Sequence, residues 1–324
     1  VQSGWPPHHL GMSMQSLTRT MARSTGESRA RFKLGAELSR WVAYVFAAPS
    51  FFLLITTLVL PILVVVLMSC TDFRLGESGI EWIGIRNYTD IISDRVFRNS
   101  LLNTCTYVII VVPGSVILGL LLAVMIEGLS RGKWLYRMIF FLPVTSTMVA
   151  MSLVWKYLFH SNIGPFNLLL QSLGLPVLDF FNETSLVLLG LAIINIWSLS
   201  GFNMVLFAAG LTAVPEELYD AASVDGMDGA IDRFFGVTLP LLGPTLMFVL
   251  VTSTVTAFKV FDTVAVITRG GPRGASDVLL YTTYLESFSY LRMGPGAAMT
   301  VVFLVIILFF ALLQARVLDK KVHY

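Results

Sequence analysis

Six long apolar segments, separated by polar connections, dominate the pattern of this chain. They run over residues 41–69, 101–126, 134–158, 185–210, 241–267 and 296–317. A helix needs about 20 apolar residues to cross a hydrocarbon core of about 30 Å. Lipid offers the backbone no hydrogen-bond partner, and the strands of a membrane barrel would alternate and be about half as long, so unbroken apolar runs predict helices. The pattern therefore predicts an all-α, polytopic membrane protein with six transmembrane helices.

Composition and charge support the same class. Of the 324 residues, 56% are apolar and 13% are charged, and the mean hydropathy is +0.77. The formal net charge of +2 is too small to indicate binding of nucleic acid. Cys70 and Cys105 lack the spacing of a metal site, and the adjacent His8 and His9 have no further ligands nearby. We therefore expect no metal site.

The polar segment 1–38 precedes a transmembrane domain that we expect over residues 39–324. This segment has no apolar stretch of the kind found in signal peptides, so we expect a cytoplasmic tail. Lys and Arg gather in the tail, after the second apolar segment and over residues 316–321. Because such residues favour the cytoplasmic side, the sequence predicts a multi-pass protein of the cytoplasmic (inner) membrane with both termini inside.

The polar connection 211–240 stands out because it is acidic. Its acidic residues are Glu216, Glu217, Asp220, Asp225, Asp228 and Asp232. Pro215 suits the first turn of a helix, and Gly226 supplies the left-handed residue that commonly ends one. The sequence thus predicts a helix of about ten residues in this connection.

One face of this expected helix is small and apolar. Leu218, Ala221 and Ala222 fall at positions i, i+3 and i+4, which would let another backbone approach closely. A helix lying on the membrane surface would instead be rich in Lys, Arg and bulky apolar residues. The acidic composition therefore favours docking of a soluble protein.

The same residues resemble a known motif. The runs that carry the resemblance are Tyr219-Asp220-Ala221-Ala222, Asp225-Gly226, Val237-Thr238-Leu239-Pro240 and Pro244. They resemble the EAA loop in permease subunits of binding-protein-dependent ABC importers, in the carbohydrate branch related to the maltose and glycerol-3-phosphate systems. Asp220 departs from the Glu that the family usually has at this position. Further stretches similar to the family are Trp82 to Tyr88, Asn99 to Thr104 and Arg269 to Pro272.

The resemblance implies a type I importer permease that forms half of a translocation path. It implies as partners a second homologous permease, two ATP-binding cassette ATPase subunits and an external substrate-binding protein. The residues that it assigns to a cytoplasmic coupling loop are Glu217, Asp220, Ala221, Ala222, Asp225, Gly226, Leu239 and Pro240.

We do not expect this chain to catalyse a reaction. The stretch nearest to a phosphate-binding G-x-x-x-x-G-K-[ST] loop is Gly128 to Trp134, whose spacing and last residue are wrong. We therefore expect no catalytic residue and no cofactor here, with ATP and Mg used by the partner subunits. The expected cargo is a carbohydrate such as an acidic oligosaccharide, and glycerol 3-phosphate or another phosphorylated polyol is the alternative. A secondary carrier or channel is an alternative of another class, but it would not explain the acidic loop.

Charged and polar residues inside the apolar segments are candidates for a substrate path, because they are costly in lipid. Lys259 and Asp262 are three residues apart, so on one helix they would share a face and could neutralise each other. Alternatively, they line an aqueous cavity together with Phe258 and Phe261. Asn195 and Asn203 belong to a polar patch in the fourth segment, where hydrogen bonds between helices are the other explanation.

Overall fold

The computed structural model describes residues 42, 44–77, 79–227 and 229–319. The expected tail 1–38, with His8 and His9, lies outside the described residues, as does Asp228. The chain divides into two compact units, residues 1–64 and 65–324.

The first unit contributes most of one apolar helix. The helical stretch Tyr44–Met68 is 25 residues long and is apolar enough to cross a membrane, as predicted for 41–69. It contains the π-helical turn η1, Ile55–Val59, followed by the α-helix α2, Leu60–Met68. The π-helical turn ends two residues before Pro61, which has no backbone N–H to donate.

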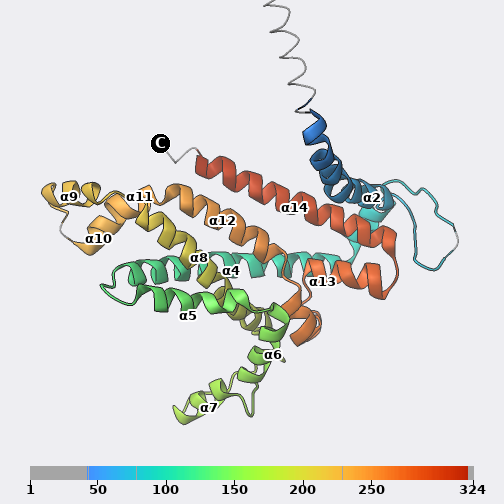
Figure 1. Ribbon diagram of the computed structural model, residues 1–324. Helices are drawn as coiled ribbons and strands as arrows, with labels where there is room; N and C mark the ends of the chain where they lie inside the picture. Colours follow the sequence, from blue (N-terminus) through green and yellow to red (C-terminus); the bar gives the residue numbers. More distant parts are fainter. Residues whose placement is uncertain (1–41, 43, 78, 228, 320–324) are drawn as a thin grey trace, which may run out of the picture. The chain divides into compact units, whose positions relative to one another are not determined.

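The second unit is built of helices (Figure 1). In chain order they are α3 Arg86–Ser93, α4 Arg95–Glu127, α5 Lys133–Thr145, α6 Met148–Leu158, α7 Pro165–Ser172, α8 Val187–Thr212, α9 Glu216–Val224, α10 Ala230–Arg233, η2 Phe234–Thr238, α11 Leu239–Leu241, α12 Gly243–Phe258, η3 Val264–Thr268, α13 Leu279–Tyr284, η4 Leu285–Ser289 and α14 Met293–Asp319. Within the described ranges, β structure is limited to one isolated bridge between Thr71 and Trp82.

Among the residues that the structure describes, four helical stretches are long and apolar enough to cross a membrane alone, and the number rises to six if each of two bent helix pairs is one span. The predicted span 134–158 bends by 101° between α5 and α6. Pro143 lies in the last turn of α5, and Ser146 then adopts an extended conformation. The other pair, Ala230–Leu241 and α12, bends by 71°. The predicted span 241–267 is wrong as one continuous helix, because α12 ends at Phe258.

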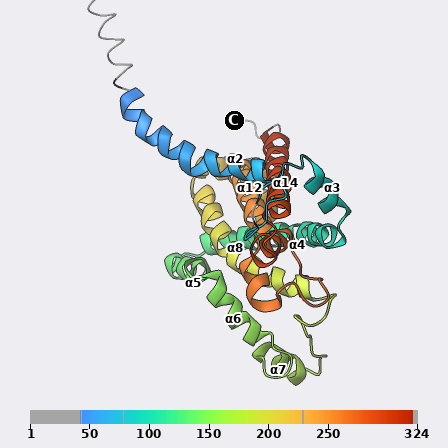
Figure 2. The same cartoon turned by 90° about the vertical axis from the view of Figure 1, so that its right-hand side faces the viewer.

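The core of the second unit lies between α4 and α8, with α12 packed against both. Side chains that are fully buried there include Tyr107, Val111, Leu191, Ile194, Met204 and Phe207. α14 lies beside α12 and α13 around a second cluster that contains Phe258 and Phe303 (Figures 1 and 2). α6 and α7 extend away from these helices in both views.

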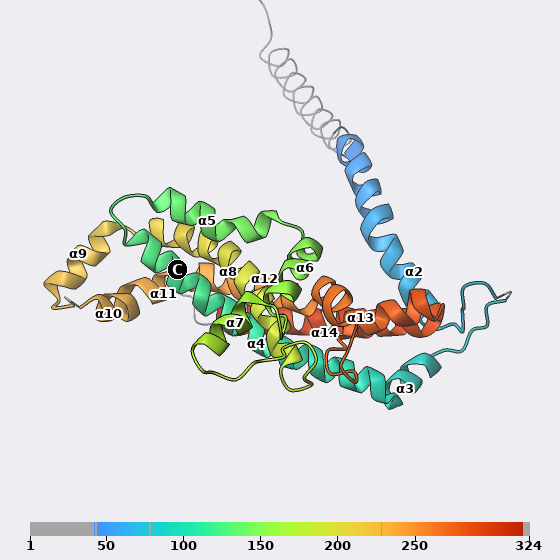
Figure 3. The ribbon, with the colours of Figure 1, turned by 90° about the horizontal axis from the view of Figure 1, so that it is seen from below.

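The two ends of this helix layer differ. α9, α10 and the connection between α4 and α5 lie at one end, which we call the α9 end (Figures 1 and 3). α3 and α13 lie toward the opposite end, which we call the α3 end. The bend between α5 and α6 lies between these two ends.

The packing of α5 on α8 predicts a strong effect of one methyl group. A Cβ at Gly201 of α8 would overlap the backbone carbonyl oxygen of Phe140 in α5, which cannot move without shifting the helix. We expect Gly201→Ala to destabilise the protein by about 1–3 kcal/mol, the usual cost of overpacking. Thermal unfolding of the detergent-purified protein measures this, and Gly128→Ala is the control because its Cβ would meet ordinary contacts at 3.4 Å. Equal melting temperatures for both variants would contradict the prediction.

Candidate functional site

The acidic connection folds as the helix that the sequence predicts. α9 begins after Pro215, which has an extended conformation (φ −61°, ψ 135°), and ends where Gly226 adopts φ +87°. The N–H of Gly226 donates to the carbonyl of Ser223 at 3.1 Å, and that of Met227 donates to the carbonyl of Ala222 at 2.9 Å. These two bonds form a Schellman end, which requires the left-handed residue that glycine supplies most readily.

The rest of the connection folds back and fastens α9. Tyr219 Oη lies 3.1 Å from Thr238 Oγ1 in η2, and Arg233 Nε donates to the carbonyl of Met227 at 2.8 Å. Thr238 is buried. The segment from α9 to η2 is therefore a folded unit that joins α8 to α12, and we call it the α9–η2 loop.

The exposed side of the α9–η2 loop is both acidic and apolar. Glu217, Asp220, Ala221, Asp225, Gly226 and Pro240 are exposed, whereas Leu239 is half-buried. The expectation that Ala222 shares the exposed face with Leu218 and Ala221 is wrong, because Ala222 is buried. Three large apolar side chains that the sequence pattern did not single out are also exposed: Val224, Ile231 and Phe235. They could have been found in the sequence, because bulky apolar residues within a polar connection often mark a surface that binds another protein.

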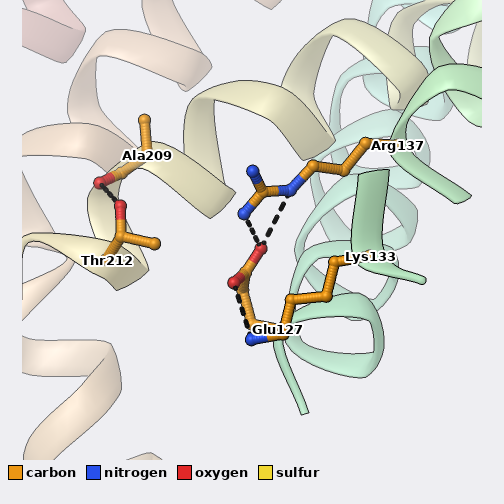
Figure 4. A network of polar contacts seen from close by, with 5 residues as sticks. All are labelled: Glu127, Lys133, Arg137, Ala209 and Thr212. Atoms are coloured by element: carbon orange, nitrogen blue, oxygen red, sulfur yellow. Dashed lines mark hydrogen bonds and ion pairs between the residues drawn. The ribbon is translucent and has the colours of Figure 1, made fainter. Parts of the chain in front are cut away.

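A charged cluster fixes the neighbouring connection at the same end. Glu127 at the end of α4 accepts from Lys133 Nζ at 3.4 Å and from Arg137 Nε at 3.2 Å, and an Arg137 terminal nitrogen also pairs with it. In Figure 4 the Arg137 guanidinium points in the direction of the last turn of α8. In that turn, Thr212 Oγ1 donates to the carbonyl of Ala209 at 2.9 Å. Lys133 and Arg137, which belong to the basic residues used to predict the orientation in the membrane, are thus held by the Glu127 carboxylate.

A cavity of about 300 Å³ opens among α6, α8 and the end of α12. Its lining residues are Met148, Asn195, Ser198, Leu199, Thr256, Lys259, Val260, Phe261, Asp262 and Thr263. The lining therefore combines one cation, one carboxylate, an amide and hydroxyl groups with apolar side chains. Such a mixture of apolar walls and a few polar groups is typical of sites for small polar molecules.

The cavity lies where two helices are interrupted. Met148 is the first residue of α6, directly after the 101° bend, and Lys259 is the residue that caps α12. Residues 259–261 are not helical. Because non-helical backbone is tolerated inside a membrane only where it borders protein or a water-filled cavity, the two breaks and the cavity belong together.

The structure brings together four of the six path candidates: Asn195, Lys259, Phe261 and Asp262. Lys259 and Asp262 do not share a helix face, because α12 ends before them, and neither forms an ion pair with any residue that the structure describes. Of the two alternatives for this pair, the structure therefore does not show the neutralising ion pair, and both residues line the cavity.

The other two candidates are structural. Phe258 is 1% exposed and its ring centroid lies 5.3 Å from that of Phe310 in α14. Asn203 is fully buried, and its Nδ2 donates to Ser253 Oγ at 3.0 Å, which joins α8 to α12. A Cβ at Gly119 of α4 would lie 2.7 Å from the Cβ of Asn203, so the helices meet closely at this point.

No cluster of three potential metal ligands occurs in the ranges that the structure describes. The acidic side chains of α9 are exposed, and Asp262 is the single carboxylate in the lining of the cavity.

The family of this chain is evident from comparison with known proteins. The profile of the family described as "binding-protein-dependent transport system inner membrane component" matches residues 95–324. The chain belongs to this family. It is therefore a permease-type component of a transport system in the membrane, as the acidic loop and the helix pattern predicted.

Relatives extend the similarity over most of the permease. The chain is 34% identical over 249 residues to the sn-glycerol-3-phosphate transport system permease protein UgpA of Agrobacterium fabrum, covering 75% of this chain and 83% of the relative. It is 31% identical over 306 residues to the sulfoquinovosyl glycerol transport system permease protein SmoG of the same organism, covering 94% and 99%.

Solved structures confirm the fold. A chain from a bacterial ABC transporter involved in the import of the acidic polysaccharide alginate superposes with a TM-score of 0.77 at 21% identity, covering 89% of this permease and 99% of that chain. The same transporter with a pentasaccharide-bound periplasmic protein gives a TM-score of 0.75. The helical importer-permease fold predicted from the sequence is therefore confirmed.

The contact between Tyr219 and Thr238 predicts how firmly α9 is held. Removing one hydroxyl partner in Tyr219→Phe should weaken the α9–η2 loop by about 1 kcal/mol, so amide hydrogens of Glu216–Val224 should exchange about fivefold faster. Mass-spectrometric hydrogen exchange measures this. Tyr157→Phe is the control, because Tyr157 is exposed and lies on α6. Unchanged exchange in α9 would mean that the hydroxyl contact does not hold the helix.

Proposed function

We propose that this permease is one of two membrane subunits of an ATP-driven importer for a carbohydrate that carries an anionic group. The observation that carries the proposal is the folded, exposed and acidic α9–η2 loop, which joins two helices that both line the cavity. A loop of this kind suits a soluble subunit that pushes on the helices, whereas a channel or secondary carrier has no need of one.

The loop is proposed as the coupling contact with an ATPase subunit. Glu217, Asp220 and Asp225 would meet basic groups of that subunit, and exposed Leu218 and Val224 would pack in its groove. Because the side chain of Asp220 is shorter than that of glutamate, a basic group of the ATPase subunit would have to approach the helix more closely to pair with it. ATP and Mg would be bound by the two ATPase subunits, and this chain would need no cofactor or ATPase site of its own.

This assignment sets the orientation. The α9 end would face the cytoplasm, together with Arg131, Lys133 and Arg137, and both termini would lie on that side. The α3 end would then face the external substrate-binding protein. A binding protein as partner is supported by the family's description and by the complex of the structurally similar alginate transporter.

The proposed cargo class rests on the cavity together with the relatives. Lys259 offers a cation that forms no ion pair with a carboxylate of the described residues, and Phe261 lines the same cavity with an aromatic ring. Glycerol 3-phosphate, sulfoquinovosyl glycerol and alginate, which name the transporters similar to this one, all carry anionic groups. An acidic oligosaccharide or glycoside is the first choice, and a phosphorylated polyol such as glycerol 3-phosphate is the second.

The coupling role predicts a selective effect of Gly226→Asp. The backbone of Gly226 has φ +87°, so a side chain there strains the end of α9 and adds charge to the docking surface. We expect at least a tenfold loss of ATPase subunits that co-purify with the permease in mild detergent, with membrane insertion unchanged. Gly132→Asp is the matched control: Gly132 has φ +78°, open space around its Cβ and a place in the α4–α5 connection at the same end. Full ATPase association of Gly226→Asp would refute the coupling role.

The cargo class predicts a charge-selective effect of Lys259→Gln. Because a hydrogen bond to a charged group contributes about 1.5–3 kcal/mol, uptake of an acidic cargo at low concentration should fall about tenfold or more, while ATPase association stays intact. Proteoliposomes with the complex and its loaded binding protein measure uptake of glycerol 3-phosphate, an alginate tetrasaccharide and maltotetraose. Lys156→Gln, an exposed lysine on α6, should have no effect. Unchanged uptake of the acidic cargo in Lys259→Gln would reject the role of this lysine.

A further inference from the structure

Four aromatic rings form a continuous row that begins at the cavity. Phe261, which lines the cavity, lies 6.0 Å from Tyr281 and 5.2 Å from Tyr284, measured between ring centroids. Tyr284 lies 6.4 Å from Tyr281, nearly parallel to it, and 5.6 Å from Phe288. Distances of this size are those of rings in contact, so we call these four residues the aromatic row.

Exposure increases along the row. Tyr281 is 7% exposed, Tyr284 is 43% exposed and Phe288 is 62% exposed. The row therefore runs from the wall of the cavity to the surface of α13 and η4, which lie toward the α3 end (Figure 3). That end is the side on which the proposed function places the binding protein.

Helix geometry lines up the rings. Tyr281 and Tyr284 are three residues apart, and Tyr284 and Phe288 are four apart, and side chains at these spacings are neighbours on a helix. The ring contacts between Tyr281, Tyr284 and Phe288 agree with this spacing.

The start of α13 is firmly anchored. Leu279 N donates to Thr104 Oγ1 of α4 at 2.8 Å, and Asn103 Nδ2 donates to the carbonyls of Gly274 and Asp277 at 3.0 and 2.9 Å. Burial, and secondly the nearby Asp277 carboxylate, raise the pKa of the Tyr281 phenol, so Tyr281 stays neutral. The row is thus a fixed, uncharged surface.

We propose that the aromatic row is a stacking track that passes sugar rings from the α3 end into the cavity beside Lys259. This inference rests on the proposed function as a carbohydrate importer and adds residues of α13 and η4 to its path. The apolar face of a sugar ring packs on an aromatic ring with weak C–H···π contacts. Several weak contacts in series suit passage, because each ring binds enough to guide the sugar and not enough to retain it.

The connection with the cavity distinguishes this role from an ordinary membrane-interface belt. Tyr and Phe at the level of lipid headgroups anchor many membrane proteins. Here the inner ring of the row shares a cavity wall with Lys259 and Asp262, which would be costly against lipid. A row that starts at charged groups is expected to meet water and polar cargo.

Cysteine labelling tests whether the row faces an aqueous path. Tyr284→Cys and Phe288→Cys, in a complex carrying Cys70→Ser and Cys105→Ser, should react with a membrane-impermeant maleimide as fast as Arg273→Cys in the exposed loop before α13. Val305→Cys, exposed on the apolar α14, is the control expected to stay unlabelled. Cysteines at 284 and 288 that remain as unreactive as the one at 305 would overturn the proposal, since lipid or the second permease would then cover the row.

Uptake tests whether the row carries sugar rings. Tyr284→Leu combined with Phe288→Leu keeps the surface apolar but removes the rings. In proteoliposomes with the loaded binding protein, this variant should reduce uptake of the tetrasaccharide that wild type transports by about tenfold at low concentration, with assembly unchanged. Phe248→Leu removes an equally exposed ring from α12, outside the row, and should behave as wild type.

The outcomes separate this inference from the proposed function. If wild type transports none of glycerol 3-phosphate, alginate tetrasaccharide and maltotetraose, the carbohydrate function fails. If wild type transports a tetrasaccharide and the double variant matches Phe248→Leu, only the stacking track fails. Transport of glycerol 3-phosphate alone would also overturn the track, because this cargo has no sugar ring, while the importer function would stand.

Discussion

Every backbone N–H and C=O within a lipid bilayer must find a hydrogen-bond partner, and this constraint governs the structure. α4 and α8 meet it by remaining continuous for 33 and 26 residues. α5 and α12 are interrupted instead. The chain changes direction where α5 ends at Thr145, and α12 ends at Phe258. Both interruptions border the same cavity. The irregular backbone and the polar cavity thus require each other, and the continuous pair α4–α8 provides the frame around them.

The position of the α9–η2 loop gives this arrangement a mechanical consequence. The loop joins α8 to α12, and both helices reach the cavity with their far parts, α8 through Ser198 and α12 through Thr256. At 1.5 Å per residue, the 14 residue steps from Ser198 to Thr212 span about 21 Å. If an ATPase subunit moves this loop as a rigid body, as the proposed function requires, both helices would carry the displacement to the cavity. The contacts of Tyr219 and Arg233 would hold the loop together during such a movement.

Local signals in the sequence account for what could be predicted. Apolar length revealed the spans, and Pro215 with Gly226 revealed the limits of α9, because these effects depend on a few neighbouring residues. The end of α12 had no such signal, since no proline or glycine lies between Pro244 and Gly270. Beyond this end Phe261 lines the cavity, whereas the ring of Phe258 packs against Phe310 of α14. Tertiary contacts also buried Ala222 and paired Asn203 with Ser253.

The same break decides what charge the cavity can offer to cargo. On an unbroken helix, Lys259 and Asp262 would stand one turn apart and could pair, which would leave little attraction for an anion. With α12 ended at Phe258, both line the cavity without forming an ion pair. Each then acts on a bound molecule at its own position: the ammonium attracts an anionic group, and the carboxylate repels it and accepts hydrogen bonds from hydroxyls. For an acidic sugar, the proposed cargo, this arrangement would favour one orientation, with the charged group toward Lys259 and the hydroxyls toward Asp262.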